Sequence, residues 1–302
     1  MNTSPLTVLG VAHDALNFAM PAEACDCHTH VFGPSANYPL SPERNYMPGD
    51  ALVPDLLALH DGLQIARVVI VHPSPYGTDN ACTLDALRLL GPRGRGVAVI
   101  DAHTTDAELQ AMHKVGVRGI RLNLETSGIH DSDYAATQLR WATARVAPLG
   151  WHLQMFTNLS VMASLREVIN TLDTPVVFDH FCLARAELGT SQPHFDTLLA
   201  LLASGRVWLK LSAPHRVAQD PDGAAMTEMA RTLIAHRPDR LLWGSDWPHP
   251  GGRPGQPRHR DQVEAFNPIN DGHALNRLAA WVDDAATLRQ ILATNPARLY
   301  DF

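Results

Sequence analysis

Three features that would direct a chain to a membrane, a nucleic acid or an oxidising compartment are missing from this sequence. No apolar run reaches the roughly 18 residues of a membrane-spanning helix. The formal net charge is −7 and the Lys and Arg residues form no block, so we expect neither nucleic acid nor an anionic membrane as a partner. Cysteine is scarce, with 4 residues in 302, which favours buried thiols in a reducing cytosol over a disulfide scaffold.

The first residues also lack the signals of a secreted protein. They carry no positive charge ahead of their apolar stretch, so we expect no signal peptide and a cytoplasmic protein. Residues 1–22 are expected to form an irregular arm, and residues 23–302 a single domain.

Short apolar runs alternate with longer amphipathic segments along that domain. Several runs, such as Ala66–His72 and Pro175–His180, are almost continuously apolar, which is typical of parallel strands buried on both faces. The predicted strands are 24–31, 66–72, 96–101, 117–124, 151–156, 175–180, 206–212 and 240–246, and the predicted helices are 79–90, 106–115, 134–147, 160–172, 194–203, 223–236 and 283–293. This pattern and length predict one (β/α)8 TIM barrel of the α/β class. A doubly wound open sheet is the alternative, although no G-x-G-x-x-G or P-loop follows a strand to support it.

One connection is unusually long. Residues 247–272 follow the last predicted strand and are rich in Pro and Gly. In a barrel they would lie over the carboxyl-terminal face, where long loops often act as lids or binding loops. A solvated excursion without a role is the alternative.

Histidines and acidic residues gather where the predicted strands end. The first strand ends in His28 and His30, which point the same way because they are two residues apart in a strand. The sixth strand ends in Asp179 and His180, and the eighth ends in Asp246. Since barrel enzymes build their sites at these strand ends, we expect the three imidazoles and Asp246 to converge.

Two chemistries suit this set of groups. Neutral imidazoles with a carboxylate form a good ligand set for one divalent ion, zinc above all. Without a metal, the histidines would polarise a substrate carbonyl while Asp246 takes a proton from water. Residue types alone leave both open.

Longer motifs add a family resemblance. The blocks Ala24-Cys-Asp-Cys-His-Thr-His-Val-Phe-Gly-Pro34, Gly119-Ile-Arg-Leu-Asn123, Trp243-Gly-Ser-Asp-Trp-Pro-His249 and Thr294-Asn-Pro-Ala-Arg-Leu-Tyr300 resemble the amidohydrolase superfamily, within it the 2-pyrone-4,6-dicarboxylate lactonase and sulfomuconolactone hydrolase group. The resemblance covers almost the whole chain. It implies a barrel, hydrolysis of a cyclic ester and an Asp246 that activates water. It leaves the metal open, because the dicarboxylate lactonases are understood to work without one and the sulfomuconolactone hydrolases use zinc.

The same resemblance implies substrate-binding residues. Arg121, Arg216 and Tyr46 match positions of the kind that hold carboxylates in the dicarboxylate lactonases. Leu183 stands where those enzymes have an arginine, and Phe156 where a tyrosine is expected. A second expected arginine, after Asn123, is also missing. Fewer guanidinium groups mean fewer bidentate contacts, so a single anionic group is predicted on the substrate.

Further residues are candidates for the pocket. His72 and Ser74 end the second predicted strand, His249 follows Asp246 and could orient it or contact substrate, and Lys210 could stabilise charge inside the barrel. Each has a structural alternative: an arginine can be an ion-pair partner, a tyrosine can pack a loop, and a lysine can support the fold.

The sequence therefore predicts a hydrolase of a small anionic lactone, such as a pyrone, a muconolactone or a sugar-acid lactone. The alternatives are a metal-dependent decarboxylase of an aromatic acid and a non-catalytic small-molecule-binding barrel. Either a monomer or a homo-oligomer is compatible with these patterns.

Overall fold

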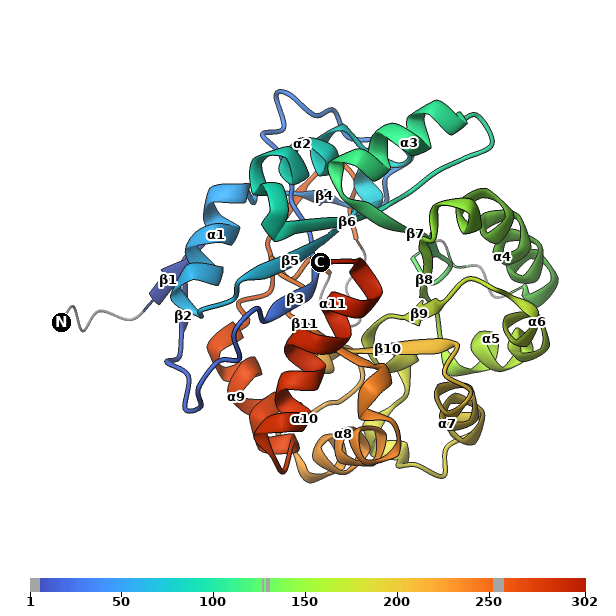
Figure 1. The fold of residues 1–302 in the computed structure, drawn as a ribbon. Coiled ribbons are helices and arrows are strands. Elements are labelled where there is room, and N and C mark those ends of the chain that lie inside the picture. Colours follow the sequence, from blue (N-terminus) through green and yellow to red (C-terminus); the bar gives the residue numbers. More distant parts are fainter. Residues whose placement is uncertain (1–5, 127, 129–130, 252–257) are drawn as a thin grey trace.

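The computed structural model describes residues 6–126, 128, 131–251 and 258–302. Eight parallel strands form one sheet in the order β11-β10-β9-β8-β7-β6-β5-β3. Figure 1 shows them as a ring with the helices outside it. The strands are β3 (Cys25–Thr29), β5 (Arg67–Val71), β6 (Gly94–Ala98), β7 (Val117–Asn123), β8 (His152–Phe156), β9 (Val176–Phe178), β10 (Val207–Ser212) and β11 (Leu241–Gly244). This architecture confirms the predicted (β/α)8 barrel.

The first and last strands meet at their carboxyl ends. The Asp246 amide donates to the His28 carbonyl at 2.9 Å, and the His30 amide donates to the Trp247 carbonyl at 2.8 Å. Gly244 permits this approach, because a Cβ there would lie 2.6 Å from the Cβ of His28. The closure of the barrel therefore brings the H-x-H motif beside Asp246.

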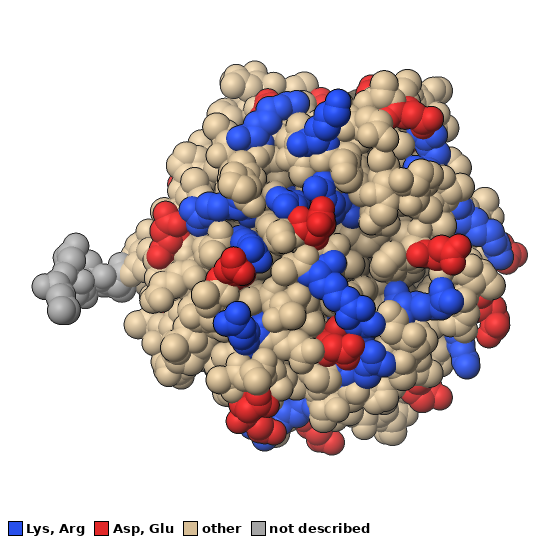
Figure 2. Space-filling view, in the orientation of Figure 1, with Lys and Arg blue, Asp and Glu red and all other residues tan. Residues whose placement is uncertain are grey.

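The helices surround the strands and cover one end of the ring. They are α1 (Val53–Gly62), α2 (Ala81–Leu90), α3 (Asp106–Val115), α4 (Ser132–Val146), α5 (Leu159–Ser164), α6 (Arg166–Thr171), α7 (Phe195–Ala203), α8 (Ala224–His236), α9 (Asp271–Trp281), α10 (Ala285–Arg289) and α11 (Asn295–Tyr300). Figure 2 shows the face around α11, where basic and acidic side chains alternate. No helix among the described residues is long and apolar enough to cross a membrane.

The core has two parts. The larger cluster fills the space between the strands and the outer helices. A smaller one lies inside the barrel, where Cys25 and Cys27 pack with valines of the neighbouring strands and with Tyr300 of α11. All four cysteines are free and buried, as expected from their scarcity.

Several boundaries differ from the prediction. Helix α1 was not expected, and the predicted helix 160–172 is divided into α5 and α6 at Leu165. Strand β6 begins at Gly94 rather than at residue 96. Glycine is rare in strands, so Gly94 and Gly96 weaken the sequence signal for one. In the structure α2 packs directly on both glycines. The predicted last helix continues, through a π-helical segment, into α11, since Pro296 lies in the first turn where its missing N–H costs nothing.

The amino-terminal segment is not wholly irregular. Strands β1 (Leu6–Val8) and β2 (Val11–His13) form an antiparallel hairpin. The amide of Asp271, at the start of α9, donates to Nδ1 of His13 at 3.0 Å. The expected arm is therefore corrected over residues 6–13, because this contact and the packing of the hairpin on α1 order it; residues 1–5 lie outside the described part.

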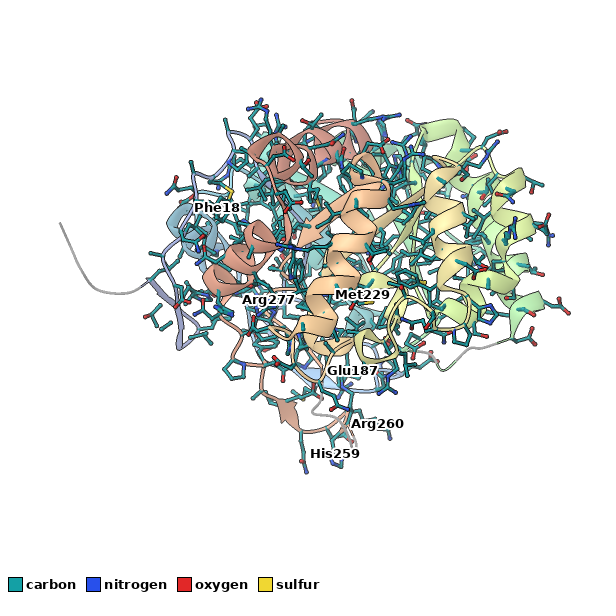
Figure 3. The ribbon with its side chains drawn as sticks, turned by 90° about the horizontal axis from the view of Figure 1, so that it is seen from below. Phe18, Glu187, Met229, His259, Arg260 and Arg277 are labelled. Atoms are coloured by element: carbon teal, nitrogen blue, oxygen red, sulfur yellow. The ribbon has the colours of Figure 1, made fainter. Side chains whose placement is uncertain are left out.

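The long connection after β11 is also more ordered than predicted. Its strand β12 (Val263–Glu264) pairs in parallel with β4 (Met47–Pro48), and helix α9 begins within it at Asp271. Residues 252–257 lie outside the described residues. Figure 3 shows His259 and Arg260 at the end of the molecule opposite the helices that cover the ring in Figure 1.

Candidate active site

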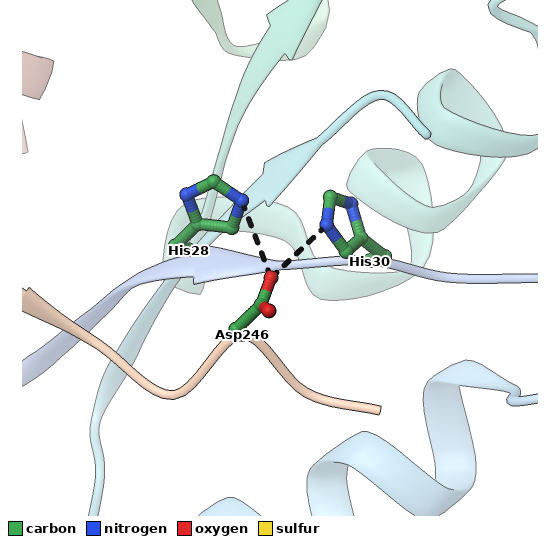
Figure 4. Close-up of side chains that lie close together, drawn as sticks. All are labelled: His28, His30 and Asp246. Carbon is green, nitrogen blue, oxygen red and sulfur yellow. Dashed lines mark ion pairs between the residues drawn. The ribbon is translucent and has the colours of Figure 1, made fainter. Parts of the chain in front are cut away.

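The carboxyl ends of β3, β9 and β11 bring three imidazoles around one carboxylate oxygen. Oδ1 of Asp246 lies 3.6 Å from Nε2 of His28, 3.4 Å from Nε2 of His30 and 3.8 Å from Nε2 of His180. Figure 4 shows His28 and His30 directed at this carboxylate. All four side chains are buried. We call this group the floor of the site.

The backbone is bent where it presents these groups. His180 has a φ of 49° and Asp246 a φ of 70°, in the left-handed region that residues other than glycine avoid. The pairing of β3 with β5 shifts register between Asp26 and Thr29, and such irregularities re-aim side chains near active sites. Backbone strain of this kind often accompanies function.

Each imidazole of the floor is held through its other nitrogen. Nδ1 of His30 lies 2.7 Å from the Val71 carbonyl, and Nδ1 of His180 lies 2.8 Å from Oγ of Ser212. Because a carbonyl only accepts, Nδ1 of His30 carries a proton, and Nε2 is the ring nitrogen that faces Asp246. An imidazole nitrogen and a carboxylate oxygen placed in this way suit a shared cation or proton.

A second buried charge network lies beneath His28. Oδ1 of Asp179 is 3.1 Å from Nδ1 of His28 and 3.4 Å from Nζ of Lys210. Lys210 donates to Oε1 of Gln154 at 2.7 Å, and Gln154 donates to Oδ2 of Asp179 at 3.0 Å. Burial alone would raise the pKa of Asp179, but His28 and Lys210 hold it well below the usual value. The network fixes the orientation of His28.

Sequence reasoning did not assign Asp179 or Gln154 to the site. The signal for Asp179 was its place beside His180 at a strand end. Gln154 carried a weaker signal, a polar residue inside an otherwise apolar strand.

Arg216 binds the floor itself. Its Nε and Nη2 donate to Oδ2 of Asp246 at 3.2 and 2.8 Å, and Nη2 also donates to the Pro250 carbonyl. Burial would raise the pKa of Asp246, but Arg216 and then the imidazoles outweigh it and hold the pKa well below the usual value. Asp246 is therefore a carboxylate at neutral pH, with Oδ2 engaged and Oδ1 available.

His28 and His180 are neutral at the same pH. Burial, reinforced by Lys210, lowers the pKa of His28 to about 4. Burial also lowers the pKa of His180 well below its usual value. Nε2 of His28 and Oδ1 of Asp246 are buried atoms that lack a hydrogen-bond partner among the described residues. Neutral nitrogens and a carboxylate oxygen with free lone pairs, within 4.8 Å of one another, could hold a divalent metal.

A cavity opens above the floor. It encloses about 380 Å³ including its open mouth. Of the residues predicted for substrate binding, its wall contains Tyr46, Ser74, Arg121 and Arg216. It also contains six residues that were not predicted to bind the substrate: Pro73, Asn123, Thr126, Phe156, Pro250 and Arg258. Among the described residues of the lining, Asp246 is the only acidic one, so the cavity suits an anionic ligand.

Comparison with known proteins places this barrel in a family. The amidohydrolase family model matches residues 25–302. The chain belongs to the amidohydrolase family. It is 34% identical to the 2-pyrone-4,6-dicarboxylate hydrolase of Comamonas testosteroni over 94% of this chain and 92% of that one. It is 33% identical to the 4-sulfomuconolactone hydrolase of Hydrogenophaga intermedia over 97% and 94%.

Solved structures agree. A Pseudomonas putida protein described as a 2-pyrone-4,6-dicarboxylic acid hydrolase superposes with a TM-score of 0.78 at 30% identity, over 93% of this chain and 98% of that one. The family resemblance drawn from the motifs is thus confirmed, and this amidohydrolase is an enzyme.

Two residues expected in the pocket of this amidohydrolase lie outside its wall. Both ring nitrogens of His72 lie within hydrogen-bonding distance of structural groups: Nδ1 is 3.0 Å from Oγ1 of Thr83, and Nε2 is 3.0 Å from the Gly77 carbonyl. His249 has a φ of 66°, and its Nε2 lies 3.1 Å from Asp271. It lines a separate cavity beside the amino-terminal hairpin.

Proposed function

We propose that this amidohydrolase hydrolyses a small anionic lactone, of the pyrone, muconolactone or sugar-acid type. One observation carries the proposal: an ionised Asp246, with one oxygen free among three imidazoles, forms the floor of a cavity walled by arginines. The reactions named for the relatives above, opening of a pyrone and of a muconolactone, are consistent with it. The pyrone and muconolactone types would place the enzyme in the breakdown of aromatic compounds.

The proposed reaction begins with water held at Oδ1 of Asp246. The carboxylate accepts a proton as the water oxygen bonds to the lactone carbonyl carbon. The tetrahedral oxyanion is stabilised by the polar groups fixed around it, a term that is often the largest in acyl transfer. The ring C–O bond then breaks, and Asp246 returns its proton to the leaving oxygen. The product is an open-chain hydroxy acid, or an enol acid where the ring oxygen was bonded to a double-bonded carbon.

The residues of the floor also fit a metal, for which we propose one zinc ion. His28, His30, His180 and Asp246 would hold it, since nitrogen-rich sites favour zinc over magnesium or calcium. When bound, such an ion polarises a carbonyl and lowers the pKa of water. Catalysis without a metal is the alternative, with Asp246 as base in either case.

Recognition of the substrate is proposed for the wall. Arg121 is 7% exposed and stacks over Phe156, with its carbon Cζ 5.6 Å from the ring centre. Its Nη2 lies 3.7 Å from Oδ2 of Asp179, whereas its Nε lacks a hydrogen-bond partner among the described residues, so we propose that Arg121 keeps a donor for a substrate carboxylate. Tyr46 and Ser74 also line the cavity. Arg216 is engaged by Asp246, so we assign it to positioning and charge control of the base instead.

A substrate panel tests the proposal. Pyrone carboxylates, muconolactones and sugar-acid lactones are assayed by proton release, and aromatic carboxylic acids by CO2 release. The Asp246→Asn variant serves as the blank, and elemental analysis of protein purified without added ions gives the metal content. Turnover of a lactone is expected. Release of CO2 with no lactone turned over would establish the decarboxylase instead, and tight binding without any turnover would establish a binding protein.

A further inference from the structure

A third arginine reaches the cavity from a part of the chain that the family motifs do not include. Arg258 lines the wall together with Tyr46, Arg121 and Arg216. It belongs to the long connection after β11. The missing arginines at Leu183 and after Asn123 predicted a single anionic group on the substrate. Arg258 adds a guanidinium group that this prediction did not count.

The position of Arg258 is fixed from two sides. Nε and Nη2 donate to the two carboxylate oxygens of Glu264, at 2.9 and 2.6 Å. The guanidinium carbon lies 3.6 Å from the centre of the Tyr46 ring. Glu264 is paired with Pro48 in the β12–β4 ladder, and Tyr46 directly precedes β4, so both contacts depend on the same two short strands. We call Arg258, Glu264 and Tyr46 the rim clamp.

The rim clamp leaves one guanidinium nitrogen of Arg258, a residue of the cavity lining, without a hydrogen bond to the described part of the chain. Nη1 of Arg258 makes no hydrogen bond to a residue that the structure describes, although Nε and Nη2 are both used. The Arg258 side chain keeps 27% of its surface exposed, whereas the Tyr46 residue keeps 4%. Glu264 is not among the residues that line this cavity, and it binds the Nε–Nη2 edge of the guanidinium. A guanidinium held in this way is preorganised to donate to an anion, since little rotamer entropy is left to lose.

We propose that Arg258 is a specificity-determining residue, which binds an anionic group on the substrate at the Tyr46 side of the cavity, away from Asp246. The inference rests on the proposed lactone hydrolysis. With Arg121 available for one anionic group and Arg258 for another, the enzyme prefers a lactone with two anionic groups to the same ring with one.

Matched lactones and matched variants test this. The substrates are 2-pyrone-4,6-dicarboxylate and 2-pyrone-6-carboxylate, which differ by one carboxylate on the same ring. The variants are Arg258→Met, which removes the fork, Arg258→Lys, which keeps the charge, and Arg260→Met as control. Arg260 lies two residues further on, is 65% exposed and pairs with its neighbour Asp261.

We expect Arg258→Met to lower kcat/KM for the dicarboxylate by about 10- to 100-fold, as for loss of a charge-assisted hydrogen bond. The value for the monocarboxylate should change by less than about 3-fold. Arg258→Lys should fall between, and Arg260→Met should match the parent. Equal losses on both substrates, or no loss on the dicarboxylate, would overturn the proposal.

A binding assay separates this inference from the proposed function. In the Asp246→Asn background, calorimetric titration measures the affinity for both pyrones without turnover. Weaker dicarboxylate binding with Arg258→Met added supports the site even if no lactone is hydrolysed. Unchanged binding of both pyrones would overturn it even if hydrolysis is observed.

Discussion

The floor and the rim of the cavity are built differently. The floor consists of buried side chains at the ends of barrel strands, and each imidazole is tied by Nδ1 to another barrel group: Val71, Ser212 or Asp179. The rim clamp depends on two strands of two residues each and includes a partly exposed arginine. The difference suggests that chemistry is fixed by the barrel and selection of the substrate by its loops.

The strongest test of this division is Asp246→Asn. The amide keeps the volume but cannot take a proton from water, so kcat should fall by about 100- to 10,000-fold. Circular dichroism and thermal unfolding should show an intact fold. Retention of more than about a tenth of kcat, a loss of only ~1.4 kcal/mol, would remove Asp246 from the mechanism.

The buried charge network beneath the floor should also contribute more to stability than the rim clamp does. Lys210→Met leaves Asp179 buried with fewer partners, and loss of one member of a buried ion pair costs about 3–5 kcal/mol of unfolding free energy. Arg258→Met at the rim should cost less than about 1 kcal/mol, because its pair is partly exposed. Urea unfolding measures both. Adding Asp179→Asn to Lys210→Met should recover part of the loss; similar costs for the two single variants would contradict the comparison.

Arg216 binds Asp246 of the floor and also lines the cavity wall. A variant can show whether it acts on the base or on the substrate. Arg216→Met should lower kcat/KM by about 1.5–3 kcal/mol, the worth of a hydrogen bond to a charged group. Since Arg216 holds down the pKa of Asp246, the acid limb of the rate profile should move to higher pH. The loss should be equal for a charged and a neutral lactone of one ring. A loss confined to the charged lactone would make Arg216 a substrate contact, as the sequence suggested.

The last prediction separates buried from exposed histidines. Burial lowers the pKa of His72 to about 4 and that of His152 to about 3. The unfolded chain, with histidine near 6.5, binds more protons than the folded one below that pH. Stability should therefore fall as pH drops from about 6.5 toward 4, by up to about 1.4 kcal/mol per pH unit for each group. His152→Gln should reduce the slope, and the exposed His103→Gln should not; equal slopes would exclude this cause.

The sequence was most informative where a side chain acts from a strand end. Periodicity predicted the barrel, and the spacing of His28 and His30 with the places of His180 and Asp246 predicted a convergence that the structure contains. It was least informative where contacts join distant segments. Nothing local indicates that Glu264 would hold Arg258 against Tyr46, or that Arg216 would bind Asp246. His249 was expected in this pocket, but it lies in another cavity, where its Nε2 is 3.1 Å from Asp271, a residue 22 positions further along the chain.

The β12–β4 pair has a consequence for engineering. Because the β12–β4 pairing fixes Glu264 beside Pro48, the number of residues between Arg258 and Glu264 determines where the Arg258 guanidinium lies. Lengthening that spacer by one residue would displace the guanidinium without altering any side chain of the catalytic floor. We therefore expect variants with a longer or shorter loop at this point to accept lactones of other sizes more readily than variants with single substitutions.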